Sequence, residues 1–378
     1  MKPQKLKALS LFSGCGGMDL GVRQAGFDVL VSIERDPHCC ESLRANGKCQ
    51  SAPTKVIEAD IRTISPTILA EEIGLDMSKL DLLFGGPPCQ AFSQIGKQKG
   101  LADERGLLLF EMVRFAQALK PKVVFIEQVK GLVSAKDKTG KRGGILQLLL
   151  DELTQIGYVP KWKVINAADF AVPQKRQRLF VVATLDENGF EFPHAVCAEQ
   201  PKPTLFGSLK PYTTVGQAIA GLDKPELKGQ NGYSRADSHV DPTPAGDRCR
   251  INGVPEGSHL AAQINVLPSE QIKGLTKKDT TKFLRTSRFA PSNTLRGGEV
   301  FFHPTENRYL TPREYLRVHG YPDEFILKGP IRGRSGRVKN LDQYRQIANS
   351  VPPPLAKAIA EKIRGYLCQK SLSFSATA

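Results

Sequence analysis

The sequence lacks several features that mark common classes of protein. No apolar run approaches the roughly 20 residues of a membrane span, so we expect no membrane partner. It has no C-x-x-C pair and no histidines at ligand spacing, which predicts no bound metal. The start MKPQKLKALSLF leads from a short apolar run into a glycine loop, unlike a secretion signal. The eight cysteines are therefore expected to be reduced thiols in a cytoplasmic protein.

Acidic residues are too few to balance the basic ones. The chain of 378 residues has 53 Lys and Arg against 38 Asp and Glu, a net charge of +15. Residues 270–339 alone hold 15 basic and 7 acidic side chains. Such an excess is typical of a protein with a polyanionic partner, most often nucleic acid. The alternative is a solvated basic face without a partner.

Strand and helix patterns alternate in the first half of the chain. Apolar runs predict strands at 7–12, 28–33, 80–84, 122–127 and 178–184, and helices at 107–120 and 145–156. This alternation predicts an α/β fold with a largely parallel sheet covered on both faces.

The region from about 190 to 335 is rich in Pro, Gly, Lys and Thr, and its periodicity is weak. A proline-started amphipathic helix returns near 353–366. We therefore expect a large α/β domain over 1–188 plus 340–378. A smaller, irregular domain is expected over 189–339.

The stretch GGPPCQAFS, residues 85–93, follows the apolar run that ends at Phe84. Glycines permit a sharp turn and prolines fix the backbone, so the stretch can hold the Cys89 thiol in place beyond a strand. The alternative is a stiff turn whose cysteine is a small buried hydrophobe.

A second glycine-rich stretch, LFSGCGGMDLG, follows the first predicted strand and opens a helix. Asp19 replaces the third glycine of G-x-G-x-x-G, which argues against a dinucleotide fold and an NAD dehydrogenase. Glu34 and Asp60 stand where the next two strands should end. Together these residues predict a site for an adenosine-type cofactor.

In this order, LFSGCGGMDLG, GGPPCQAFS, VVFIEQV, VPQKRQRLF, SNTLRGGE and QIANSVPPPLAKAI resemble the motifs of the DNA cytosine-5 methyltransferases. The likeness covers nearly the whole chain, apart from much of residues 190–285. It implies a Rossmann-like methyltransferase sheet, with the small domain recognising the DNA target. It also implies S-adenosyl-L-methionine as cofactor and double-stranded DNA as partner.

The resemblance assigns the chemistry to four side chains. Cys89 is the expected nucleophile, adding to carbon-6 of a flipped-out cytosine so that carbon-5 can accept the methyl group. Glu127 is expected to contact ring nitrogen 3 and the amine, although Gln128 follows it where the family has asparagine. In QKRQR, Gln174, Arg176 and Arg178 alternate, so on one strand they would share a face. The two arginines are expected to orient the base.

The resemblance also implies two sets of binding residues. Those expected at the cofactor are Phe12, Gly14, Gly16, Glu34, Asp60, Pro88, Leu108, Asn349, Ser350 and Val351. Those expected at DNA are Gln90, Ser93, Gln174, Arg296 and Gly297. Ordinary core packing is the alternative for Phe12 and Leu108.

We expect a monomeric bacterial modification enzyme of the cytosol or nucleoid, either paired with a restriction endonuclease of the same specificity or acting alone. A transfer-RNA cytosine methyltransferase is the first alternative, but the long segment between Arg178 and Asn293 favours DNA. A non-catalytic nucleic-acid-binding relative should have lost Cys89 or the glycine loop, and this chain has both. The DNA sequence recognised does not follow from these motifs.

Overall fold

The structure, a computed structural model, describes residues 5–47, 53–88, 108–137, 139–186, 190–201, 203–204, 207–227, 232–265, 283–333 and 340–375. The chain divides into two compact units. The first comprises Met1–Asn166, Gln177–His194 and Leu355–Ala378, and the second Ala167–Arg176 and Ala195–Pro354. Residues 167–176 and 340–354, which the sequence assigned to the large domain, thus group with the second unit.

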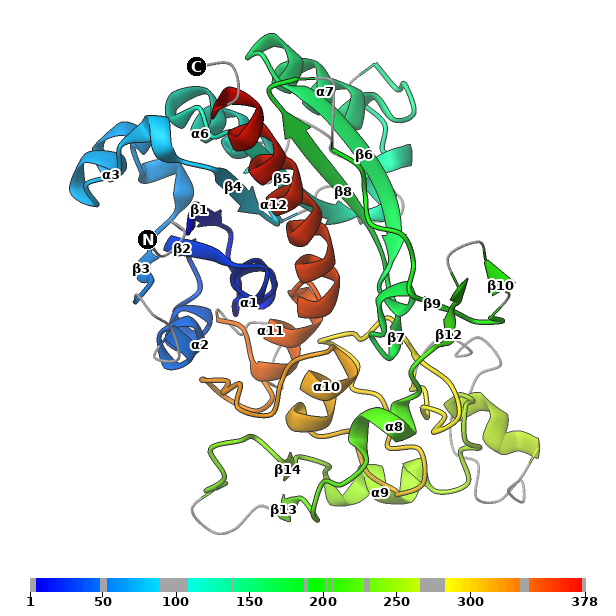
Figure 1. Ribbon diagram of the computed structural model, residues 1–378. Helices are drawn as coiled ribbons and strands as arrows, with labels where there is room; N and C mark the ends of the chain where they lie inside the picture. The colour runs from blue at the N-terminus through cyan, green and yellow to red at the C-terminus, as the bar shows by residue number, and fades with distance from the viewer. Residues whose placement is uncertain are drawn as a thin grey trace. The chain divides into compact units, whose positions relative to one another are not determined.

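The first unit is built on a seven-stranded sheet in the order β3-β2-β1-β4-β5-β8-β6 (Figure 1). Its strands are β1 (Leu6–Leu11), β2 (Phe27–Glu34), β3 (Lys55–Glu58), β4 (Leu82–Gly85), β5 (Val123–Val129), β6 (Val159–Asn166) and β8 (Gln177–Thr184). Strands β1 to β5 pair in parallel, and β8 is antiparallel to both its neighbours. The predicted α/β fold with a largely parallel, Rossmann-like sheet is confirmed.

Helices cover both faces of this sheet, which is why β4 and most of β5 are buried without alternation. They are α1 (Gly17–Gln24), α2 (Pro37–Asn46), α3 (Pro66–Glu72), α6 (Glu111–Leu119), α7 (Gly144–Gln155) and α12 (Pro353–Ser375), with the 3-10 turns η2 (Ile61–Thr63), η3 (Met77–Lys79), η5 (Leu108–Phe110) and η6 (Lys130–Ser134). α3, α6 and α7 share one apolar core with the strands. α12 meets the end of α1, where Arg364 donates to the carbonyl oxygen of Ala25 (3.4 Å).

The second unit has short elements joined by long irregular segments. They are η7 (Ala167–Phe170), β7 (Gln174–Lys175), β9 (Cys197–Ala198), β10 (Pro203–Thr204), β11 (Gly207–Ser208), β12 (Lys210–Pro211), α8 (Val215–Ile219), β13 (Glu226–Leu227), β14 (Val240–Asp241), α9 (Ala245–Ile251), η8 (Leu260–Asn265), β15 (Ser292–Asn293), α10 (Pro312–Val318) and α11 (Gln343–Asn349). Side chains in this unit donate hydrogen bonds to backbone carbonyl groups that lie outside helices and strands or at a helix end. Buried Arg285 donates to the carbonyl oxygens of Ile251, His303, Pro304 and Glu306.

Within the described part of the chain, no helix is both long and apolar enough to cross a membrane.

Candidate active site

The glycine loop after β1 is closed by a carboxylate from the next strand. Gly14 and Gly16 have φ values of 55° and 94°, a region that favours glycine. The Gly14 N–H donates to Glu34 Oε2 at 2.8 Å, so the carboxylate at the end of β2 fixes the loop. Phe12 also has a positive φ, 54°, although it is not a glycine. Such backbone strain in a non-glycine residue is frequent at functional sites.

Glu34 retains capacity for a ligand. Its other oxygen, Oε1, accepts the N–H groups of Arg35 and Asp36, both at 2.8 Å. Three donors thus occupy a carboxylate that offers about four lone-pair positions, which leaves room for a hydroxyl donor. Burial raises the pKa of Glu34 above its ordinary value, and the three N–H donors offset this only in part.

Asp60, just beyond β3, has the opposite electrostatic character. Its carboxylate caps η2 and accepts from Arg62 Nε (3.0 Å) and Nη2 (2.7 Å). These bonds lower the pKa of Asp60 to about 2, so it is ionised at neutral pH. A permanent acceptor at this strand end fits an amine such as that of adenine.

The two glycines of GGPP serve two different close approaches. A Cβ on Gly85 would collide with the carbonyl oxygen of Leu11 on the neighbouring strand β1. A Cβ on Gly86 would lie 3.1 Å from Glu127 Oε2, tighter than ordinary contact. The glycines therefore let the strand end lie against both β1 and the Glu127 carboxylate. Cys89, Gln90 and Ser93 lie outside the described residues; Pro88 is the last described residue before them and is exposed.

Gln128 anchors the segment that leads to Cys89. Its side chain is buried, and Nε2 donates to the carbonyl oxygen of Pro87 at 2.7 Å. Although the family pattern has asparagine here, the longer glutamine reaches the backbone of the same loop. Gln128 Oε1 is buried and has no partner among the described residues.

Buried Glu127 and half-buried Arg178 form an ion pair beside this segment. Arg178 lies opposite Val129 in the antiparallel β5–β8 ladder, which puts it diagonally next to Glu127 on one face. The distance from Arg178 Nε to Glu127 Oε1 is 3.1 Å, and the side chains are 15% and 11% exposed. This pair is the strongest candidate for polarising a substrate, because a buried charge in a carboxylate–guanidinium pair interacts strongly with its surroundings.

The strand expected across QKRQR is broken. Gln174 lies in β7, which pairs with β15, and Arg178 lies in β8, which pairs with β5 and β6. Arg176 stands between them, outside either strand. Because the two strands belong to different sheets, the three side chains do not continue one alternating face.

Arg176 and Gln174 hold segments of the second unit together. Arg176 Nη2 donates to the carbonyl oxygens of Ala348 (2.8 Å) and Ser350 (3.1 Å), groups left open at the end of α11. Gln174 is fully buried, and its Oε1 accepts the Leu295 N–H at 3.1 Å. This geometry makes Gln174 a positioning residue in the structure and leaves no part of it exposed to DNA.

His319 completes the same network, a role that the sequence did not reveal. Its Nδ1 lies 2.9 Å from Gln174 Nε2, and its Nε2 lies 3.0 Å from the Ser350 carbonyl oxygen. Since a carbonyl only accepts, the bonds assign the ring hydrogen to Nε2. The histidine thereby links Gln174 to Ser350, which lies between Asn349 and Val351.

Asp19, where a dinucleotide fold would have a third glycine, is also a buried network residue. Ser10 and Ser32 donate to its two carboxylate oxygens at 2.9 and 2.5 Å. Burial raises its pKa despite these bonds and the nearby Arg23 charge. It supports β1 and β2 directly beneath the glycine loop.

The remaining predicted residues lie in two places. Leu108 opens η5 and belongs to the apolar core of the first unit. Arg296 is exposed and pairs with Glu299 at 3.1 Å, and Gly297 packs on Arg345, whose Cγ would lie 2.6 Å from an added Cβ. The described residues contain no cluster of three metal-ligating side chains.

Comparison with known proteins gives this geometry its context. The profile of the C-5 cytosine-specific DNA methylase family matches residues 6–365. The Type II methyltransferase M.NgoFVII of Neisseria gonorrhoeae is 34% identical over 95% of this chain and 86% of its own length. M1.HphI of Haemophilus parahaemolyticus is 33% identical over the same shares.

Solved structures agree on the fold. A prophage-encoded E. coli protein described as a DNA modification methyltransferase aligns with a TM-score of 0.68 and 21% identity, covering 96% of this chain and 99% of that one. The Dnmt2 methyltransferase of S. pombe aligns with a TM-score of 0.56 and 16% identity, with the same coverage. On the family match across nearly its whole length, the chain belongs to the C-5 cytosine-specific DNA methylases and is a DNA (cytosine-5-)-methyltransferase.

Proposed function

We propose that the enzyme methylates carbon-5 of a cytosine flipped out of duplex DNA, through a transient bond between Cys89 Sγ and carbon-6. The observation that supports this most is the Glu127–Arg178 pair, which lies beside Gly86 on the segment that leads to Cys89. Carbons 5 and 6 are inaccessible within the base stack, so the base must leave the duplex.

The thiolate adds to carbon-6, which breaks the aromaticity of the ring and makes carbon-5 nucleophilic. Carbon-5 then accepts the methyl group, loses its hydrogen as a proton, and the Cys89 bond to carbon-6 breaks. Arg178 holds Glu127 Oε1 in place, and the missing side chain at Gly86 keeps space beside Oε2. That carboxyl is proposed to contact ring nitrogen 3 and the amine, while Arg178 orients the base through its carbonyl oxygen. Gln128 holds Pro87 and thereby limits where the thiol can lie.

The residues around the glycine loop fit S-adenosyl-L-methionine. An added Cβ at Gly14 would meet no atom within 4 Å, so the loop is open to a ligand. Glu34 has capacity for a ribose hydroxyl, and ionised Asp60 for the adenine amine. When bound, the cofactor supplies an electrophilic methyl group. Phe12, Gly16, Pro88 and Leu108 are proposed to line the same site. The family resemblance makes Asn349, Ser350 and Val351 further proposed cofactor contacts.

We further propose that the enzyme is a monomeric Type II modification methyltransferase, paired with a restriction endonuclease that cuts the same sequence. The names of its relatives support this assignment. Gln90, Ser93, Arg296 and Gly297 are the proposed DNA contacts, and Gln174 holds the backbone of Leu295, next to Arg296.

Bisulfite sequencing tests the proposal in cells. The gene is expressed in a bacterial host that lacks cytosine methylation, beside a Cys89→Ser control. We expect protected cytosines at one position of one short sequence, and none with the control. Methylated cytosine confined to transfer RNA, or protection that persists with Cys89→Ser, would contradict the proposal.

A further inference from the structure

A small cavity in the second unit has an unusual lining. It measures about 360 Å³ and is bounded by Pro244, Asp247, Gly297, Gly298, Arg332, Gly333 and Arg345. Two guanidinium groups therefore face one carboxylate across a polar space. We call it the arginine cavity.

The carboxylates near these arginines are already engaged by other donors. Asp247 Oδ2 accepts the hydroxyl of Tyr309 at 2.8 Å. Asp342, 3.9 Å from Arg345 Nε, accepts the N–H groups of Gly333 (2.8 Å) and Arg345 (2.9 Å). These neutral donors leave both carboxylates charged, but the 3.9 Å between Asp342 and Arg345 Nε exceeds hydrogen-bond distance, so the Arg345 guanidinium keeps donors for another anion.

Arg332 is held in position by an aromatic ring. Its guanidinium carbon lies 4.6 Å from the centre of the Tyr309 ring, within the range of a cation–π contact. Since Tyr309 is itself bonded to Asp247, the guanidinium is fixed at the cavity wall before any ligand arrives. Preorganised charge of this kind binds an anion at a lower entropic cost.

The two glycines contribute backbone donors. Gly297 packs tightly on Arg345, which explains why it has no side chain. Neither packing nor backbone conformation requires glycine at position 298. A Cβ there would meet no atom within 4 Å, and the φ of Gly298 is not in the left-handed region. Neither N–H donates to another described residue. An added Cβ at Gly298 would enter open space, so the missing side chain leaves room beside the backbone.

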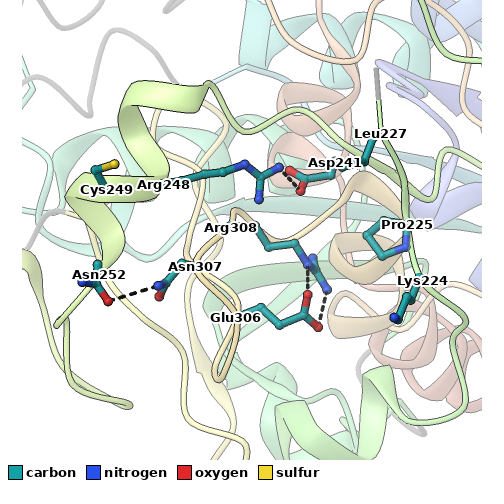
Figure 2. Close-up of a pocket in the computed structure, with 10 residues that line it drawn as sticks. All are labelled: Lys224, Pro225, Leu227, Asp241, Arg248, Cys249, Asn252, Glu306, Asn307 and Arg308. Carbon is teal, nitrogen blue, oxygen red and sulfur yellow. Dashed lines mark hydrogen bonds and ion pairs between the residues drawn. The ribbon is translucent and has the colours of Figure 1, made fainter. Parts of the chain in front are cut away.

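The larger cavity of the second unit differs in how its arginines are paired. It measures about 650 Å³, and its arginines each have a carboxylate partner (Figure 2). Arg248 pairs with Asp241, and Arg308 pairs with Glu306. These short ion pairs leave its arginines fewer donors for an anion, although Lys224 also lines this cavity.

We propose that the arginine cavity binds one phosphodiester group of the DNA backbone. Arg332 and Arg345 supply the charge, and the N–H groups of Gly297 and Gly298 donate to the phosphate oxygens. The inference rests on the DNA substrate of the family and adds a contact that fixes the register of the duplex without reading bases. It does not depend on the proposed chemistry at Cys89.

Salt-dependent binding provides the first test. Affinity for a fluorescein-labelled duplex is measured by anisotropy at increasing salt, using the sequence that bisulfite sequencing identifies. Loss of one phosphate contact lowers the slope of log affinity against log salt by about 0.9 in magnitude. We expect that change for Arg332→Gln with Arg345→Gln, since glutamine keeps the Cβ and Cγ that pack on Gly297. Gly298→Leu should act in the same direction.

Lys357→Gln is the matched control. It removes one positive charge from α12, where Lys357 pairs with Glu361 at 2.8 Å, and should leave the slope unchanged. A double variant with the wild-type slope, or a control that loses as much, would overturn the proposal.

Neutral methylphosphonate linkages test the phosphate itself. One such linkage is placed at a different position in each duplex. At one position it should weaken binding by the wild type, whereas the arginine variants, which have already lost this contact, should bind that duplex as well as they bind unmodified DNA. If every linkage has the same effect on both proteins, the cavity does not bind the backbone. If the double variant does not fold, each single arginine variant is tested instead. At the contacted position, the loss of affinity from the linkage and the loss from the single substitution should add up to more than the loss measured for the two together. The same binding measurements can be made in a Cys89→Ser background, which is catalytically inactive. Failure of the proposed chemistry can therefore be distinguished from failure of the arginine cavity to bind phosphate.

Discussion

Replacing Gln128 by leucine should slow methyl transfer far more than it weakens DNA binding. The Gln128 Nε2 to Pro87 oxygen bond is short, 2.7 Å, and buried. Leucine fills a similar volume, so little cavity forms, but the Pro87 carbonyl loses its donor. An unsatisfied buried acceptor costs about 1–3 kcal/mol.

That cost falls on the segment two residues before the nucleophile. If the whole of it appears in the transition state, where Cys89 must be held in place, about 1–3 kcal/mol corresponds to a rate loss of about 5- to 150-fold. Gln128→Asn keeps an amide donor that is one methylene shorter and should lose less. The assay is single-turnover transfer of a tritium-labelled methyl group at saturating DNA, which excludes product release.

Gln263→Leu is the matched control for a lost buried amide. Gln263 Nε2 donates to the Arg250 carbonyl oxygen at 2.7 Å in the second unit. This variant should melt at a lower temperature and keep its single-turnover rate. A Gln128→Leu enzyme as fast as wild type, or slowed no more than Gln263→Leu, would refute the anchoring role of Gln128.

Three further outcomes follow from the site. An ionised Glu34 accepts a ribose hydroxyl more strongly than the neutral acid does, and burial raises its pKa. By calorimetry, wild-type affinity for S-adenosyl-L-methionine should therefore fall as pH drops through that raised value, whereas Glu34→Gln should bind weakly at every pH. Gly86→Val should displace the Glu127 carboxylate, lowering the single-turnover rate at least tenfold while anisotropy shows unchanged DNA binding. His319→Leu removes the partner of Gln174 Nε2 and one of the two donors to the Ser350 carbonyl oxygen, which keeps its bond from Arg176. The thermal midpoint of this variant should therefore fall by several degrees, and an unchanged midpoint would contradict the network.

Local sequence pattern located much of the first unit and of its site. Apolar runs bounded by turns coincide with β1, β2, β4, β5 and β8 to within about two residues, because strands covered on both faces are apolar without alternation. Glu34, Asp60 and Glu127 could be located for the same reason. Glu34 ends β2, Asp60 lies just beyond β3, and Glu127 lies within β5 near its end.

Pairing between distant segments was not predictable in the same way. β6 contains Pro160 and two lysines and lies at the edge of the sheet, so its sequence gives little strand signal. The QKRQR alternation predicted one strand, but tertiary pairing assigns its two halves to separate sheets. His319 sits in a short helical region without a motif of its own, and only the fold brings it to Gln174.

Covalent trapping on 5-fluorocytosine tests the central claim most directly. A fluorine at carbon-5 cannot leave as a proton, so the methylated base should stay bonded to Cys89. With S-adenosyl-L-methionine and a duplex carrying 5-fluorocytosine at the target, we expect a protein–DNA band that survives denaturation and maps to the Cys89 peptide.

Two other thiols serve as controls for that band. Burial raises the pKa of Cys40 to about 12, which makes it a poor nucleophile, and Cys249 is exposed in the second unit. Cys40→Ser and Cys249→Ser should retain the band, whereas Cys89→Ser should abolish it, because a serine hydroxyl is scarcely ionised at neutral pH. A band that persists in Cys89→Ser, or a wild-type enzyme that methylates normal DNA yet forms no band, would contradict the account.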